Sequence, residues 1–355
     1  MFKYISLLFI FIKFAACTSS SEIEKMFNAA VSENFSGVIL IASEGKIIFN
    51  GVNGKRDFEN NISLSSSDIF ELASISKQFT AMMIMMCKEK GLLSYDDLVE
   101  KYLDLPYHEI TIRNLLTHTS GLPDYQKIMD ENWDKSKVAG NTEILEYLNI
   151  YKPEMIFTPG EKYEYSNTGY VLLGSIVEKV TGEDFVELSR KWIFEPLKMI
   201  NTSIRTNQEK KELNNHAYGH KKDSLERFVN ATNFLSSNYT IWLGNRKGPG
   251  RVSSNVFDLL LWDKALYGET LVSKKTLNEA FTPYKLNNGK LSFYGFGWRL
   301  NKDSNNKIVS HSGSNPGYKT RIVRLLDNKK TIVILSNNDF SLNEIEEKLI
   351  DALSN

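Results

Sequence analysis

Ser74 and Lys77 are the residues of this chain whose types and spacing best suit nucleophilic chemistry. Residues three apart on a helix share one face, with Cβ atoms within about 5–6 Å of each other. A serine hydroxyl is a weak nucleophile until a base takes its proton, and a lysine one turn along can do this or assist another base. A helix beginning here also adds partial positive charge where an oxyanion would form. The pair therefore predicts a serine nucleophile at the start of a helix.

The spacing Ser-x-x-Lys alone is a weak signal, because two other pairs, at 43–46 and 304–307, also have it. Both of those pairs lie in sequence that is typical of turns. Only the Ser74 pair precedes a long apolar run, at 79–87, and such a run predicts a helix that is buried on all sides. The alternative is an N-cap serine beside a solvated lysine, but a polar pair at the tip of a buried helix favours catalysis.

A second polar group, Tyr165 and Asn167, follows a turn that Pro159 and Gly160 predict. Residues two apart in an extended segment point to the same side. A phenol has an ordinary pKa of about 10, which a neighbouring lysine ammonium lowers, so Tyr165 is a candidate base. Asn167 can accept a hydrogen bond from Lys77 and donate one to a substrate carbonyl. The alternative is a packed tyrosine after a turn.

The third feature is the stretch His311-Ser-Gly-Ser-Asn-Pro-Gly317, between two predicted strands. A glycine on an edge strand allows a ligand to approach the backbone closely. The N–H of Ser314 could then join the N–H of Ser74 in an oxyanion hole, where backbone donors stabilise developing negative charge. The alternative for this stretch is a glycine-rich hairpin loop.

Strands are predicted at both ends of the chain, with helices between them. The strands are at 36–42, 46–50, 293–300, 307–310, 317–326 and 330–335, and a terminal helix is at 341–353. This order predicts an α+β fold, with one antiparallel sheet from both chain ends, flanked by helices, and an inserted helical domain. We expect a sheet domain at 22–78 and 266–355 and a mainly helical domain at 79–265. We interpret 201–250 as long loops on the rim of the site.

The chain of 355 residues has equal numbers of acidic and basic side chains, so no net charge draws it to nucleic acid. Its two cysteines and five histidines form no zinc-type cluster. The sequence therefore predicts no nucleic-acid partner and no metal or other cofactor.

The segment 1–17 has a basic start, a short apolar core and small residues before Cys17. This pattern is typical of a secretory signal peptide and is too short for a membrane-spanning helix. Phe14-Ala-Ala-Cys17 resembles a bacterial lipoprotein cleavage box, although Phe14 replaces the usual leucine. We expect secretion across the inner membrane, lipidation of Cys17 and a periplasmic or membrane-anchored location. Cleavage without lipidation is the alternative.

Together the three motifs resemble those of the serine β-lactamase and penicillin-binding-protein superfamily, in its class C-like branch. The motifs are Ser74-x-x-Lys77, Tyr165-Ser-Asn167 and His311-Ser-Gly313, and four further stretches, at 110–125, 157–170, 250–254 and 294–298, also resemble that family. The resemblance extends from about 35 to 340 and implies the β-lactamase/transpeptidase-like fold.

The resemblance also implies roles for the residues of the motifs. Ser74 would be the acylated nucleophile, Lys77 and Tyr165 would share proton transfer, and Asn167 would orient Lys77 and the substrate. The segment His311, Ser312, Gly313 and Ser314 would hold the substrate backbone and the oxyanion. His311 replaces the lysine that is usual in class C β-lactamases, and a histidine there is more similar to the esterase and D-aminopeptidase branches. An imidazole with an ordinary pKa near 6.5 would offer charge to a substrate carboxylate only in the acid range.

The resemblance therefore implies a serine hydrolase that acts through an acyl-enzyme on amides or esters. The candidate substrates are D-amino-acid peptides, short esters and, weakly, β-lactams, so the partner is a small molecule or a peptide. The alternative is a penicillin or cell-wall sensor that is acylated without turnover. The oligomeric state stays open.

Overall fold

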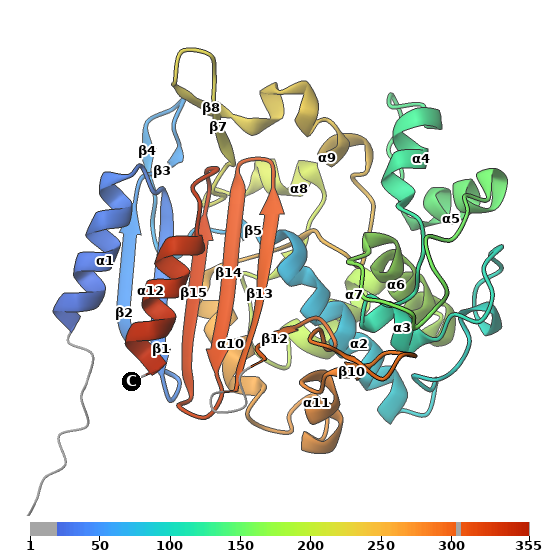
Figure 1. Cartoon of the computed structure of the whole chain (residues 1–355). Helices are drawn as coiled ribbons and strands as arrows, with labels where there is room; N and C mark the ends of the chain where they lie inside the picture. The colour runs from blue at the N-terminus through green and yellow to red at the C-terminus, as the bar shows by residue number, and fades with distance from the viewer. Residues whose placement is uncertain (1–19, 303–306, 355) are drawn as a thin grey trace, which may run out of the picture.

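The computed structural model describes residues 20–302 and 307–354. Its centre is a six-stranded antiparallel sheet with the strand order β12-β13-β14-β15-β1-β2 (Figure 1). The strands are β1 (Gly37–Ser43), β2 (Lys46–Asn53), β12 (Arg299–Leu300), β13 (Ile308–Asn315), β14 (Tyr318–Leu325) and β15 (Lys330–Ser336). Strand β1 pairs with β15, so both ends of the chain build one sheet, as the sequence predicts.

The interior strand β1 is covered on both faces, which explains its nearly continuous apolar sequence. Ile39 and Ile41 face α1 (Ser20–Ser32) and α12 (Asn343–Ser354), and the alternate residues face the main core. Figure 1 shows α1 and α12 side by side on the same face of the sheet. The other face carries the helices that position the site.

Helix α2 (Lys77–Glu89) lies in that main core, and ten of its 13 residues are buried. It packs against α6 (Asn167–Thr181). Ser74 does not open α2 itself, because the 3₁₀ helix η1 (Ala73–Ser76) precedes it. The 3₁₀ turn still leaves Ser74 and Lys77 one turn apart.

The remaining elements connect or extend these layers. They are β3 (Lys55–Asp57), β4 (Ile62–Ser63), β5 (Phe70–Glu71), η2 (Val99–Lys101), α3 (Ile112–Leu116), α4 (Tyr125–Asn132), α5 (Asn141–Tyr151), α7 (Phe185–Ser189), the π-helical turn η3 (Arg190–Phe194), β9 (Val252–Ser254), α10 (Val256–Ala265), α11 (Lys274–Ala280), β10 (Tyr284–Lys285) and β11 (Leu291–Ser292). Helix α10 contacts β1 and β15, so it covers the face of the sheet opposite α1 and α12.

The segment 201–250 is more ordered than the loops that we expect from the sequence. It holds β6 (Ser203–Ile204), α8 (Asn207–Glu212), β7 (His220–Lys222), β8 (Phe228–Asn230), η4 (Ala231–Asn233), η5 (Leu235–Ser237) and α9 (Tyr239–Trp242). These elements are too short for a periodic sequence pattern to reveal. Figure 1 places β7, β8 and α9 above the sheet, near the turn between β13 and β14.

Two predicted strands differ from the structure. The strand predicted at 293–300 is reduced to Arg299–Leu300, and the strand predicted to end at Ser310 continues to Asn315. Strand β12 pairs only with Val309 and Ser310. Within the described residues, the stretch 311–315 therefore has no strand partner on that side, and the third motif lies on a strand with a free edge instead of in a loop.

No helix in the described ranges is long and apolar enough to cross a membrane. The segment 1–17, with Cys17, lies outside the described residues, so its signal function and lipidation stay predictions. The boundaries of the helical domain, at 79 and 265, stay predictions as well.

Candidate active site

The structure brings Ser74 and Lys77 together with Asn167. Lys77 Nζ lies 3.1 Å from Ser74 Oγ, 2.8 Å from Asn167 Oδ1 and 2.9 Å from the carbonyl oxygen of Pro249. Lys77 is fully buried, whereas Ser74 is partly exposed. Ser74 is therefore reachable from solvent, with the lysine amine directly behind it.

The surroundings of Lys77 favour its neutral form. Burial lowers its pKa well below the ordinary value, and the positive charges of Arg246 and Arg299 lower it further. A neutral amine has two N–H donors and one lone pair. If the donors serve Asn167 Oδ1 and the Pro249 carbonyl, the lone pair faces the Ser74 hydroxyl. This arrangement suits Lys77 as the base that takes the serine proton.

Tyr165 also lies at this cluster, with its ring centroid 4.8 Å from Lys77 Nζ. Burial raises the pKa of Tyr165, and this effect outweighs the hydrogen bond with Ser74 and the charge of Arg299, which lower it. The expectation of a phenol with a lowered pKa is therefore wrong. The physical reason is that burial disfavours the charged phenolate more than the neighbouring donors and charges favour it. Tyr165 keeps its proton and can donate it.

Helix α6 positions Asn167 as its first residue, and Ser166 caps the helix by accepting a hydrogen bond from the Gly169 N–H. The Ser166 N–H donates to His118 Nδ1 at 3.1 Å, and the His118 ring centroid lies 4.2 Å from that of Tyr165. His118 is fully buried. It holds the Tyr165-Ser-Asn167 segment from behind, a role that its place in the stretch 110–125 did not reveal.

The structure corrects the expected role of His311. Its side chain is 1% exposed, its Nδ1 lies 2.8 Å from the Ser312 carbonyl oxygen and its Nε2 lies 2.8 Å from the Tyr294 hydroxyl. Since a carbonyl only accepts, Nδ1 donates to Ser312, and Nε2 accepts from Tyr294. Burial lowers the pKa of His311 to about 3, and Lys77 contributes to this shift when it is protonated. His311 therefore offers no charge to a substrate carboxylate and instead supports β13 from inside.

Gly313 permits a close approach to the β13 backbone, but the segment that approaches it is Leu72 and Ala73 of the same chain and not a ligand. A Cβ on Gly313 would lie 2.2 Å from the Leu72 carbonyl oxygen and 3.1 Å from Ala73 Cβ. Thr320 Oγ1 donates to the same Leu72 oxygen at 2.9 Å. Ala73 has a φ of +49°, a strained conformation for a non-glycine residue. The turn that carries Ser74 is thus fastened to β13 and β14.

Ser312 and Ser314 lie on β13, on either side of Gly313. The Ser314 hydroxyl accepts from Lys319 Nζ at 2.9 Å and is exposed. The role of the Ser314 N–H in an oxyanion hole stays a prediction. In the described part of the chain, no group of three or more His, Cys, Asp or Glu side chains could hold a metal ion.

Two arginines near the site carry no local sequence signal. Arg299 is exposed on β12, with its Cζ 5.9 Å from the Tyr165 ring centroid. Arg246 follows α9, and its Nη1 donates to the Tyr125 hydroxyl at 2.5 Å. Both arginines lower the pKa of Lys77. Only the tertiary fold brings their charges to the nucleophile.

An antiparallel sheet with helices on both faces, and a partly exposed Ser74 with the buried Lys77 beside Tyr165 and Asn167, define a protein with the β-lactamase/transpeptidase-like fold. The family model described as Beta-lactamase matches residues 23–353. The chain therefore belongs to the β-lactamase family.

A curated relative, penicillin-binding protein 4* of Bacillus subtilis, is 39% identical over 322 residues, which cover 90% of this chain and 71% of the relative. Protein flp of Staphylococcus aureus is 27% identical over 330 residues, which cover 89% of this chain and 61% of that relative.

The structure of an octameric penicillin-binding protein homologue from Pyrococcus abyssi matches with a TM-score of 0.78 and 29% identity, over 90% of this chain and 74% of that one. The structure of D-amino acid amidase from Ochrobactrum anthropi matches with a TM-score of 0.76 and 23% identity. The match covers 94% of this chain and 98% of the amidase. At that identity the second likeness concerns the fold alone.

Proposed function

We propose that this protein is a serine hydrolase that forms an acyl-enzyme on Ser74 with amides or esters of D-amino acids. The observation that carries the proposal is the Lys77 amine, which is buried, favoured in its neutral form and 3.1 Å from Ser74 Oγ. Membership of the β-lactamase family supports a serine hydrolase.

The reaction begins when Lys77 takes the Ser74 proton as Oγ attacks the carbonyl carbon. The backbone N–H groups of Ser74 and Ser314 stabilise the oxyanion. Tyr165 gives its proton to the leaving group and recovers one from Lys77, so the amine is neutral again when the acyl-enzyme has formed. Water then attacks the ester carbonyl as Lys77 takes its proton. The bond to Ser74 Oγ breaks, Lys77 returns the proton to Oγ, and the acid product leaves the regenerated enzyme.

The substrate class rests on similarity to relatives. The names of these relatives include a penicillin-binding protein and a D-amino acid amidase. The uncharged His311 favours such amides and esters over efficient β-lactam hydrolysis, because it cannot supply the charge of the usual lysine. A β-lactam is expected to acylate Ser74, and the resulting acyl-enzyme is expected to hydrolyse slowly.

Labelling with a fluorophosphonate tests the nucleophile. One adduct should form on a peptide containing Ser74, and Ser74→Ala should abolish it. Ser43→Ala is the matched control, because Ser43 and Lys46 share the same spacing at a hairpin, and this variant should label normally. Labelling that survives Ser74→Ala contradicts the proposal. Intact mass during turnover of a D-alanine anilide separates a hydrolase from a sensor, since a sensor would keep the acyl group.

We further propose that residues 1–17 direct secretion and that Cys17 becomes a lipidated N-terminus. The support is the sequence pattern before Cys17 alone. Globomycin should cause the precursor to accumulate, and Cys17→Ser should release soluble protein from the membrane. If neither occurs, the protein is secreted without a lipid.

A further inference from the structure

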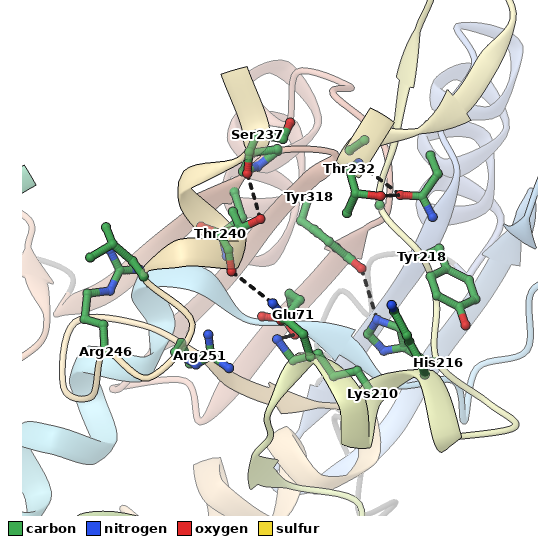
Figure 2. Close-up of a pocket in the computed structure, with 18 residues that line it drawn as sticks. Glu71, Lys210, His216, Tyr218, Thr232, Ser237, Thr240, Arg246, Arg251 and Tyr318 are labelled. Atoms are coloured by element: carbon green, nitrogen blue, oxygen red, sulfur yellow. Dashed lines mark hydrogen bonds and ion pairs between the residues drawn. The ribbon is translucent and has the colours of Figure 1, made fainter. Parts of the chain in front are cut away.

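A cavity of about 150 Å³ lies beside the candidate nucleophile, between the segment 207–251 and the turn after β13 (Figure 2). Its walls include Glu71, Lys210, Arg246, Arg251, Asn315 and Pro316. The cavity borders the turn that carries Ser74. A Cβ placed on Gly250 would lie 3.4 Å from Arg246 Nη2, in the cavity wall, and 3.9 Å from the carbonyl oxygen of Ala73, in that turn.

The walls of this cavity carry an excess of positive charge. Lys210, Lys211, Arg246 and Arg251 line it, against a single carboxylate, Glu71. Glu71 is already paired, since its Oε1 lies 2.6 Å from Lys210 Nζ. Figure 2 shows Glu71, Lys210 and Arg251 grouped at the floor of the cavity.

Neither arginine forms an ion pair with a carboxylate, although the charges of Glu71 and Glu209 act on Arg251 from a greater distance. Arg251 is only 7% exposed, and its Nη2 donates to the carbonyl oxygen of Arg205 at 2.7 Å. Arg246 donates to a phenol, and its buried Nε has no hydrogen-bond acceptor. In the described part of the chain, no carboxylate oxygen lies within 4.0 Å of either guanidinium. Buried charges are normally paired, so this excess indicates an anionic ligand.

The position of the cavity along β13 decides which part of a substrate it meets. Tyr165, the proposed proton donor to the leaving group, lies near His311, with ring centroids 6.3 Å apart. The leaving group must therefore lie over the His311 end of β13. The cavity contacts Asn315 and Pro316 at the opposite end. It consequently faces the acyl part of the substrate.

We propose that this cavity binds a carboxylate on the acyl part of the substrate, through Arg251 and Arg246. The hydrolase then prefers N-acyl-D-amino-acid amides and esters whose acyl chain ends in an acid. This inference rests on the proposed function and names its substrate class. A guanidinium presents a fork of N–H donors that matches the two oxygens of a carboxylate.

Two substrates that differ only at the acyl end test the inference. Glutaryl-D-alanine p-nitroanilide and pentanoyl-D-alanine p-nitroanilide have acyl chains of equal length and the same leaving group, and only the first carries an acyl carboxylate. We expect kcat/KM to favour the glutaryl compound by about tenfold or more, as for a hydrogen bond to a charged group. Arg251→Gln should bring this ratio close to one.

Two further variants keep the test decisive. Arg227→Gln is the matched control, because Arg227 is exposed and pairs with Asp223 away from the cavity, so the ratio should not change. If Arg251→Gln fails to fold by circular dichroism, the exposed Lys211→Gln decides, with an expected severalfold fall of the ratio. A wild-type ratio of one or below, or a ratio that survives both cavity variants, overturns the inference.

A binding experiment separates this inference from the proposed function. Calorimetry on Ser74→Ala compares glutaryl-D-alanine with pentanoyl-D-alanine, without any chemistry at the serine. Tighter binding of the glutaryl compound, lost in Ser74→Ala/Arg251→Gln, supports the cavity even if the wild type hydrolyses neither anilide. Equal binding of both compounds rejects the cavity, even where Ser74 is labelled and both anilides are hydrolysed.

Discussion

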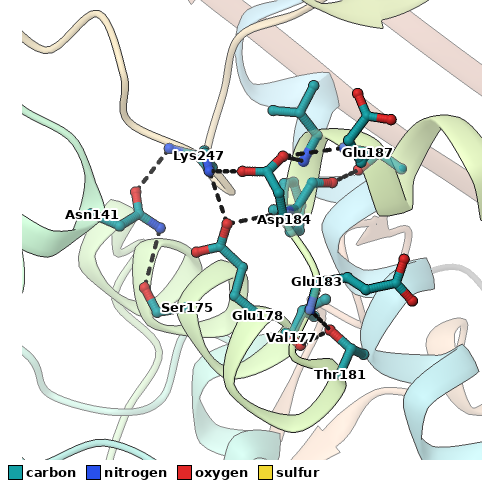
Figure 3. Close-up of polar contacts among 12 residues, drawn as sticks. Asn141, Ser175, Val177, Glu178, Thr181, Glu183, Asp184, Glu187 and Lys247 are labelled. Carbon is teal, nitrogen blue, oxygen red and sulfur yellow. Dashed lines mark hydrogen bonds and ion pairs between the residues drawn. The ribbon is translucent and has the colours of Figure 1, made fainter.

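Lys77 is fully buried and Lys247 is half-buried, and the fold shifts their pKa values in opposite directions. Lys247 Nζ lies 2.8 Å from Glu178 Oε1 and also pairs with Asp184 (Figure 3). Burial alone would lower its pKa, but the hydrogen bonds and charges of Asp184 and Glu178 outweigh burial and raise it. Lys247 therefore keeps its proton.

Lys77 has the opposite surroundings. Its hydrogen-bond partners are a hydroxyl, an amide and a backbone carbonyl, and the nearest strong charges are positive. Nothing then offsets the cost of burying an ammonium, so the proton leaves easily. The comparison shows that deep burial beside positive charges gives a base, whereas partial burial beside two carboxylates gives a structural ion pair.

The loop that carries Lys247 also contacts Lys77. The Lys247 N–H donates to Asn141 Oδ1 at 2.8 Å, and Asn141 Nδ2 donates to Ser175 Oγ on α6 at 3.2 Å (Figure 3). Two residues later, the Pro249 carbonyl accepts from Lys77. Lys247 thus anchors the loop that supplies one acceptor to the base.

The largest expected effect separates the two lysines directly. Lys77→Met should lower the rate of Ser74 acylation by about a thousandfold, within the usual contribution of a general base. Lys247→Met should lower it by less than about tenfold, because only the loop position changes. The measurement is the rate of fluorophosphonate labelling, with circular dichroism to verify folding. Equal losses in both variants would contradict the assignment of Lys77 as the base.

The second effect concerns Tyr165, whose pKa is raised. Tyr165→Phe should slow hydrolysis of a D-alanine amide by about 10–100-fold, because the amine leaving group needs a proton. A p-nitrophenyl ester should lose much less, since nitrophenolate leaves without one. The comparison of kcat for the two substrates checks this. A similar loss for both would indicate that Tyr165 acts as the base instead.

The third effect is a change in the pH profile. If Lys77 is the base, kcat/KM rises with pH as the amine loses its proton. Arg246 lowers the pKa of Lys77, so Arg246→Gln should raise that pKa and move the acid limb of the profile to higher pH. Lys247→Met should leave the limb in place. A limb that stays fixed in Arg246→Gln would show that another group controls the profile.

A smaller effect concerns stability. Lys247→Met should lower the free energy of unfolding by about 1 kcal/mol, because the ion pairs are partly exposed and screened by solvent. The folded pKa of Lys247 is raised, so its contribution is complete below the unfolded pKa and is lost as pH rises through the folded pKa. Urea unfolding at pH 7 and in the alkaline range should show the difference from wild type shrinking. A difference that grows with pH would contradict the ion-pair account.

The smallest expected effect is at His311. Its pKa is lowered to about 3, so it stays neutral between pH 6 and 8. The ratio of kcat/KM for esters with an anionic and a neutral leaving group should therefore be independent of pH across this range. A ratio that falls between pH 6 and 8 would show that the imidazole titrates within reach of the substrate.

Much of the fold follows from local sequence patterns. The β-rich runs near both ends predict one sheet, and the apolar run after Ser74 predicts a buried helix, because such runs lose free energy in water. The short elements of 201–250 could not be predicted, since none is long enough to show a period. The sequence also predicts too early an end for β13, at Ser310, because the polar residues that follow suggest a turn.

For the candidate site, the sequence by itself determined which side chains lie one turn or one strand step apart: Ser74 with Lys77, and Tyr165 with Asn167. Only the tertiary structure decided their protonation. Asn167 and Pro249 lie 90 and 172 residues along the chain from Lys77, and the arginines that act on it, Arg246 and Arg299, also come from remote segments. A pKa depends on burial and on charges within a few ångströms, and neither is visible until the chain has folded.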